Sequence, residues 1–145
     1  MKQIQFSDLT PTQQTLVNKA IEVREFAYAE YSKFKVGAAL IDINQNIHTG
    51  CNVESADYTL TTHAEMLAID SMVKSGCTEM MEIAIALSSQ SGDSVPCGLC
   101  RQKMTEFSIN PMIIGINLLP NNDIKSIVTY SLDELLPFAF KKSSL

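Results

Sequence analysis

The sequence predicts an α/β fold in which a mixed sheet of five strands carries helices on both faces. Helical periodicity alternates along the chain with short apolar runs, in the order αββαβαββα. Some strands are separated by helices of about ten residues or more, the connection that parallel strands need, whereas two early strands are close enough for an antiparallel hairpin. No repeat, linker or low-complexity stretch divides the 145 residues, so one domain is expected over 1–145.

The first half of the chain supplies a helix, a hairpin and a second helix. Apolar residues lie close to one helix face over residues 11–30, and Thr10 before a proline is a good N-cap. Two β-like runs at 35–42 and 47–53 are joined by a polar turn and predict a hairpin. A helix at 63–76 follows, with a glycine that suits its end.

The second half alternates strands with shorter helices. Its expected elements are a strand at 82–88, a polar loop at 88–96, a helix at 99–107, and strands at 111–118 and 124–130. Ser131 and Glu134 form a capping-box pattern that opens a final short helix. The intervening helices predict a largely parallel core for the sheet.

Composition and charge exclude several function classes. The 11 basic and 16 acidic residues give a net charge of −5, and no cluster of Lys and Arg marks a nucleic-acid-binding surface. No apolar stretch approaches the roughly 20 residues of a membrane-spanning helix. The first residues lack the hydrophobic region of a secretory signal, so a cytoplasmic protein is expected. In a reducing cytosol, the four cysteines are more often core residues or metal ligands than disulfides.

Two short segments carry the residues that indicate metal chemistry. Glu65 stands two positions after His63, and Cys97 and Cys100 stand three apart after a proline. One imidazole, two thiolates and an open fourth position make a catalytic zinc site. Both segments lie at predicted helix N-termini, where unpaired N–H groups favour thiolates. Taken alone, the cysteine pair is also typical of a redox pair or a helix core. Taken alone, His63 is also typical of a histidine at a helix cap or in the core.

Glu65 is assigned to the water on the metal, because three other residues already serve as ligands. Zinc lowers the pKa of a bound water from 15.7 to roughly 7. A carboxylate beside that water can accept its proton and return it to a leaving group. A His-x-Glu followed by Pro-Cys-x-x-Cys is the signature of the zinc nucleobase deaminases. The combination predicts a metal-assisted hydrolytic step.

Five segments in order carry a wider resemblance. They are YSKFKVGAAL at 31–40, GCNVE at 50–54, HAE at 63–65, PCGLCRQ at 96–102 and LLPFAF at 135–140. Together they cover almost the whole chain and resemble the cytidine deaminase family, in particular its small, single-domain, homotetrameric branch. Five motifs in this order are far more specific than the zinc pattern alone.

The resemblance implies a cytidine deaminase-like three-layer fold, a homotetramer or homodimer, and one Zn²⁺ per subunit on His63, Cys97 and Cys100. It implies hydrolytic deamination of cytidine and 2′-deoxycytidine to uridine and 2′-deoxyuridine, with release of ammonia, as in pyrimidine salvage. Glu65 is the implied catalytic residue. The implied substrate contacts are Phe34 against the pyrimidine, Asn52 and Glu54 on the ribose, the Ala64 N–H at the base edge, Tyr58 beside the sugar, and Phe140 from a neighbouring subunit.

Two departures concern the metal site. The small tetrameric branch usually has a third cysteine where this chain has His63, and an arginine where it has Met66. Three thiolates around Zn²⁺ leave one excess negative charge that an arginine offsets, whereas one histidine with two thiolates is neutral. The His form is that of the larger dimeric branch, so the chain resembles a hybrid of the two.

The segment 55–59 departs from the family pattern at Ser55, Asp57 and Thr59. This segment lies beside the sugar in the family, so two further enzyme hypotheses stay open. They are deamination of a modified cytosine nucleoside such as blasticidin S, with Asp57 recognising an amino group, and deamination of another aminated heterocycle. A catalytically silent zinc-containing binding protein is the hypothesis from a different class.

Overall fold

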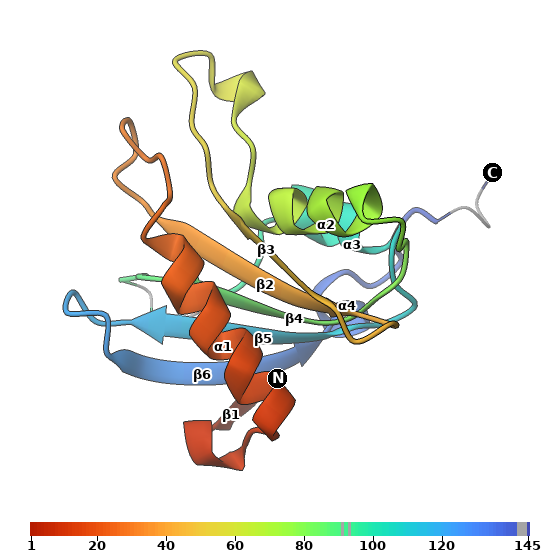
Figure 1. Ribbon diagram of the computed structural model, residues 1–145, viewed down its shortest axis with the longest axis horizontal. Coiled ribbons are helices and arrows are strands. Elements are labelled where there is room, and N and C mark those ends of the chain that lie inside the picture. The colour runs from red at the N-terminus through yellow and green to blue at the C-terminus, as the bar shows by residue number, and fades with distance from the viewer. Residues whose placement is uncertain (91, 93, 142–144) are drawn as a thin grey trace.

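One sheet organises the chain, which the computed structural model describes over residues 1–90, 92, 94–141 and 145. Within these residues it has six strands in the order β1-β6-β5-β4-β2-β3 (Figure 1). The strands are Lys2–Ile4 (β1), Val36–Asp42 (β2), Ile47–Cys51 (β3), Met80–Leu87 (β4), Met112–Leu118 (β5) and Ile124–Ser131 (β6). The α/β class with a mixed sheet is confirmed.

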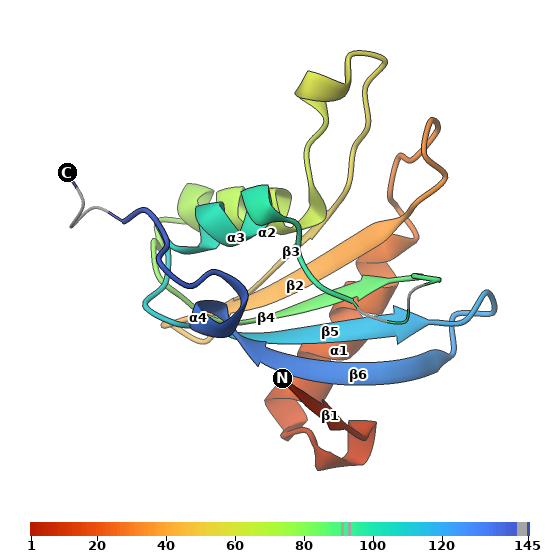
Figure 2. The same cartoon turned by 180° about the vertical axis from the view of Figure 1, so that it is seen from behind.

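Helices cover both faces of the sheet, as the sequence predicts. Helix α1 (Pro11–Arg24) packs on one face, while α2 (Ala64–Lys74) and α3 (Gly98–Met104) lie side by side on the other (Figures 1 and 2). The short α4 (Leu132–Leu135) follows β6 and contacts α3. Two 3₁₀ helices, η1 (Phe6–Asp8) and η2 (Tyr58–Leu60), lie in loops. None of the described helices combines the length and apolar character that crossing a bilayer requires.

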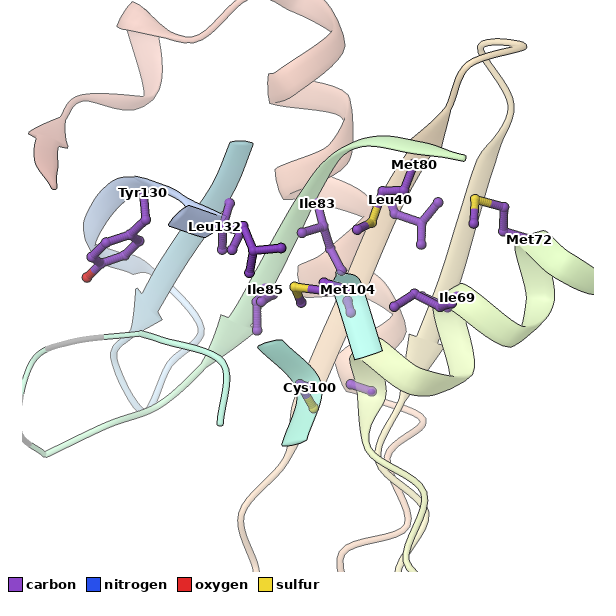
Figure 3. Packing of buried hydrophobic residues seen from close by; sticks show 14 of the residues in the cluster. Leu40, Ile69, Met72, Met80, Ile83, Ile85, Cys100, Met104, Tyr130 and Leu132 are labelled. Carbon is purple, nitrogen blue, oxygen red and sulfur yellow. The ribbon is translucent and has the colours of Figure 1, made fainter. Parts of the chain in front are cut away.

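The alternation of side chains along the strands divides the buried residues into two cores. In β2, Ala38 and Leu40 belong to the core under α2 and α3, while Ala39 and Ile41 belong to the core under α1. The first of these cores surrounds Met104 and includes Cys100 (Figure 3). Ala64 at the start of α2 and Cys100 in the first turn of α3 both belong to this core, so the start of each ligand-bearing helix is packed against buried residues.

The sheet is mixed, but the prediction of a largely parallel core is wrong. Only β4 and β5 pair in parallel among the described strands, and the other four pairings are antiparallel. The connection through α2 does join two strands of the same direction, β3 and β4. Strand β2 lies between them and runs antiparallel to both, so the crossover creates no parallel pair.

The first helix ends at Arg24, so its prediction to residue 30 is too long. The Tyr28 N–H donates to the Asn52 carbonyl at 3.0 Å, and the Glu54 N–H donates to the Tyr28 carbonyl at 2.9 Å. This pairing with the segment after β3 competes with helical hydrogen bonds and draws the backbone away from α1. As a result, residues 28–34 lie beside the two predicted ribose contacts.

The described residues form six strands and not the predicted five, because the sequence does not predict β1. Strand β1 pairs antiparallel with β6, but its three residues are too few to give a periodic signal. Residues 91 and 93 of the predicted loop 88–96 lie outside the described residues. The remaining predicted strands and helices are present with boundaries shifted by a few residues.

Candidate metal centre and substrate pocket

The three predicted metal ligands lie at the starts of two neighbouring helices. His63 is the N-cap residue of α2, Cys97 is the N-cap residue of α3, and Cys100 lies in the first turn of α3. Neither N-cap side chain makes a capping hydrogen bond to its own helix, so both keep their donor atoms available. The side chains therefore converge from two helix ends, as their sequence positions predict.

The geometry of these donor atoms fits a zinc ion. His63 Nδ1 lies 3.2 Å from Cys100 Sγ and 3.4 Å from Cys97 Sγ, and all three atoms lie within 4.8 Å of one another. A tetrahedral ion with Zn–S of about 2.3 Å and Zn–N of about 2.0 Å needs N–S separations of about 3.5 Å. The observed separations differ from this value by only a few tenths of an ångström.

Charge at the site also favours a cation. Burial raises the pKa of the Cys100 thiol, and the nearby Glu65 and Cys97 raise it further by repulsion between like charges. A divalent cation reverses this balance because it stabilises the thiolate directly. Metal binding must then release the Cys100 proton. The donor set and its charge are those of a zinc site.

Glu65 lies in the first turn of α2, next to the ligands, and its side chain is almost fully buried. Burial is the main cause that raises the pKa of this carboxyl, against smaller opposing effects of hydrogen bonds and of His63. A raised pKa brings a carboxyl closer to the working pH of a general acid and base. The residue is thus suited to carry a proton in both directions.

A pocket of about 390 Å³ opens beside these residues. His63, Glu65 and Cys97 line it, as do the predicted substrate contacts Phe34, Asn52, Glu54 and Ala64. Its volume lies in the range of small-molecule sites, which is about 300–1,000 Å³. The chain therefore brings the predicted metal site and four of the six predicted substrate contacts into one cavity.

Asn52 and Glu54 follow β3 and are both 8% exposed. The Asn52 side chain accepts from the Val36 N–H at 2.8 Å and donates to the Phe34 carbonyl at 2.9 Å. A hydrogen bond from the Ser32 hydroxyl is the main cause that lowers the pKa of the Glu54 carboxyl, in spite of desolvation. The pocket therefore has a fixed amide and an ionised carboxylate on its wall.

Tyr58 and Phe140 lie apart from this pocket. Tyr58 is 72% exposed and packs edge to face on Tyr31, with ring centroids 6.0 Å apart. It lines an adjoining hollow together with Ser32, Glu54, Thr61 and His63. Phe140 is 62% exposed and does not line the pocket of its own chain.

The departures at segment 55–59 have a local explanation. The Asp57 carboxylate accepts hydrogen bonds from the Thr59 N–H at 3.0 Å and the Thr59 hydroxyl at 2.6 Å, and so caps η2. These bonds are also what lower the pKa of Asp57. Asp57 does not line the substrate pocket, which removes the main reason for expecting it to recognise an amino group.

Arg101 has a positioning role that the sequence analysis did not assign. Its guanidinium donates to the Pro96 carbonyl at 2.7 Å and to the Leu135 carbonyl at 2.8 Å. It thereby joins the turn that carries Cys97 to the C-terminal segment. The sequence does contain one indication of this role, because Arg101 directly follows Cys100 and so lies on the ligand-bearing helix.

Gly50 permits the close approach of β3 to the start of α2. A Cβ atom at this position would lie 2.4 Å from the Ala64 carbonyl oxygen and 2.5 Å from the Ala68 nitrogen, both of which are backbone atoms. We expect Gly50→Ala to lower the free energy of unfolding by about 1–3 kcal/mol, because overpacking against backbone must move the helix. The same displacement should weaken zinc binding through His63.

The matched control for this variant is Gly98→Ala. Gly98 lies between the two cysteine ligands, yet an added Cβ there meets nothing within 4 Å. Chemical denaturation and zinc titration of both variants test the prediction. Equal stability of Gly50→Ala and the wild-type protein would contradict it.

Comparison with known proteins agrees with the fold and the site. The family profile for the cytidine and deoxycytidylate deaminase zinc-binding region matches residues 10–116. A cytidine deaminase of Sporosarcina psychrophila is 35% identical over 130 residues, which are 90% of this chain and 92% of the relative. A cytidine deaminase of Halalkalibacterium halodurans is 37% identical over 127 residues, which are 88% of this chain and 92% of the relative.

A solved structure shows the same relationship. The crystal structure of a cytidine deaminase from Burkholderia pseudomallei superposes with a TM-score of 0.80 at 36% identity, covering 91% of this chain and all of that one. The fold and the three-ligand site define a zinc-binding deaminase-like protein. The chain belongs to the cytidine and deoxycytidylate deaminase family.

Proposed function

We propose that this protein is a zinc-dependent deaminase that hydrolyses cytidine and 2′-deoxycytidine to uridine and 2′-deoxyuridine and releases ammonia. One observation carries the proposal. Buried Glu65 lines the same pocket as His63 and Cys97, whose donor atoms converge with that of Cys100. Three ligands leave the open position that a catalytic zinc requires, whereas a structural zinc has four.

The chemistry follows from the placement of Glu65. Zinc, when bound by the three ligands, acts as a Lewis acid that lowers the pKa of water to about 7. Glu65 accepts the proton of the attacking water and can transfer protons to the ring nitrogen and to the amino group. The water oxygen bonds to carbon 4 of the base, the bond to the amino nitrogen breaks, and ammonia leaves.

The other pocket residues orient the nucleoside. Phe34 offers an aromatic face for the pyrimidine, and the Ala64 N–H lies at the start of α2, where backbone donors lack helical partners. Asn52 and Glu54 are proposed to hold the sugar, since an amide and a carboxylate can bond to its hydroxyls. All four line the pocket that holds Glu65.

Ammonia release by zinc-loaded protein across a panel of amines tests this proposal. The panel contains cytidine, 2′-deoxycytidine, cytosine, adenosine, guanine and blasticidin S. Turnover of the first two alone is the expected result. Turnover of blasticidin S alone would identify a modified nucleoside as the substrate, and silence across the panel with zinc bound would favour a binding protein.

We further propose a homotetramer in which Phe140 enters the pocket of a neighbouring subunit. Phe140 and Phe138 are both exposed within one chain, and the Phe140 carbonyl is held by the Gln102 side chain at 2.7 Å. A homodimer is the alternative assembly. A cytoplasmic location and a part in pyrimidine salvage stay predictions.

Truncation after Leu136 is expected to reduce kcat/KM by more than about tenfold, because the pocket would lose an apolar contact. Zinc should remain bound, since all three ligands and the bond from Arg101 to the Leu135 carbonyl are retained. Steady-state kinetics and metal analysis of the truncated chain measure both effects. A fully active truncated monomer would refute the proposed contribution of Phe140.

A further inference from the structure

Ser32 makes a set of contacts that joins two of the proposed substrate-binding residues. The Ser32 hydroxyl donates to Glu54 Oε1, and the Ser32 Oγ atom also accepts a hydrogen bond from the Phe34 N–H at 3.0 Å. The bond from Phe34 fixes the hydroxyl as an acceptor on one side, so its only proton is directed to the carboxylate. Ser32 also lines both the substrate pocket and the adjoining hollow.

The remaining contacts of Glu54 leave it little freedom. Its other oxygen, Oε2, accepts from the Tyr31 N–H at 2.9 Å and from the Ser32 N–H at 3.1 Å. A carboxylate offers about four lone-pair positions. The described residues use three of them, so among these contacts one position on Oε1 is left for a substrate hydroxyl.

The local backbone is built to hold this arrangement. Lys33 has a φ of 58°, in the left-handed region, and its N–H donates to the Ala29 carbonyl at 3.0 Å. This turn brings the N–H groups of Tyr31 and Ser32 to the same carboxylate oxygen. The Ser32 hydroxyl is the one side-chain donor that the described residues direct at Glu54.

We propose that Ser32 is a positioning residue that fixes the Glu54 carboxylate so that its one open lone pair accepts a single hydroxyl of the nucleoside sugar. Without the Ser32 hydroxyl, the two backbone N–H groups would still hold Oε2, but Oε1 could turn away from the sugar. The proposal rests on the proposed function, because it assumes that a nucleoside sugar occupies this part of the pocket.

The test compares sugars that do and do not carry the hydroxyl. Ser32→Ala should raise KM for 2′-deoxycytidine by about tenfold and change kcat by less than about twofold, because a hydrogen bond to a charged group is lost in binding. KM for 2′,3′-dideoxycytidine should be unchanged within about twofold, since that sugar keeps the 5′-hydroxyl but lacks the 3′-hydroxyl, which is the one that this test assigns to Glu54. Ser32→Thr keeps a hydroxyl and should restore the wild-type values.

Coupling to Glu54 separates positioning from a general effect on structure. In a Glu54→Gln background, Ser32→Ala should raise KM for 2′-deoxycytidine by less than about twofold, because both changes remove the same interaction. The proposal would be overturned if Ser32→Ala raised KM equally for both nucleosides or lowered only kcat. Additive effects of Ser32→Ala and Glu54→Gln on KM would also overturn it. Thermal unfolding of each variant shows whether the fold is kept.

A binding measurement keeps this test independent of turnover. Calorimetric titration with the products 2′-deoxyuridine and 2′,3′-dideoxyuridine needs no reaction. Ser32→Ala should weaken binding of the first by about tenfold and leave the second unchanged. If Ser32→Ala has these two effects on binding but the wild-type chain deaminates nothing, the proposed reaction fails and the role of Ser32 stands. If the wild-type chain binds both sugars equally, the role of Ser32 fails.

Discussion

Replacing Glu65 with glutamine is expected to lower kcat for cytidine by about 10²–10⁴-fold, the usual contribution of a positioned general acid and base. The amide has the shape of the carboxyl but cannot accept and return a proton. Zinc content should stay at that of the wild type, because His63, Cys97 and Cys100 are unchanged. Steady-state kinetics and metal analysis on the same preparation check both parts.

A matched control for this substitution is Glu22→Gln on α1. Glu22 pairs with Lys19 on the exposed surface at 2.9 Å and is not among the residues that line the pocket. It should leave both kcat and zinc content unchanged. A Glu65→Gln variant with wild-type turnover would show that another group carries the proton.

Replacing Cys100 with alanine is expected to weaken zinc binding by more than about 100-fold, since loss of a residue that only supports a ligand already costs about 10–100-fold. Cys100 is fully buried, and two ligands, His63 and Cys97, would remain. Turnover should fall in proportion to the zinc lost. Titration against a chromogenic chelator measures the affinity.

Cys77→Ala is the control for removing a buried thiol. Cys77 is also buried and is not among the residues that converge on the metal site. Both substitutions remove a sulfur atom from the same core cluster, so their effects on stability should be similar in the absence of zinc. Retention of zinc by Cys100→Ala at wild-type affinity would exclude Cys100 as a ligand.

The metal site could be predicted from the sequence because its residues are local to two helix starts. His63 and Glu65 are two apart, and Cys97 and Cys100 are three apart, so each pair needs only one helix N-terminus to be placed. The structure brings the two pairs together on one face of the sheet. The order of the strands could not be predicted in the same way, because the position of β2 between β3 and β4 depends on long-range pairing.

The wall of the pocket was less accessible to sequence reasoning. Phe34, Asn52 and Glu54 were predicted only through the family resemblance, since each residue alone suits a core or a strand end. The contacts of Ser32 depend on a turn at Lys33 and on the pairing of Tyr28 with the segment after β3. Helical periodicity predicts that α1 continues to residue 30, so the sequence does not indicate this turn.

Oxygen transfer from solvent tests the central claim most directly. Zinc-loaded protein is incubated with cytidine in water enriched in oxygen-18, and the product is analysed by mass spectrometry. We expect uridine that carries one solvent oxygen at position 4, formed together with an equal amount of ammonia. The Glu65→Gln variant should form almost none of this labelled uridine. Zinc-loaded protein that forms no uridine, or forms uridine without the label, would contradict hydrolytic deamination at this site.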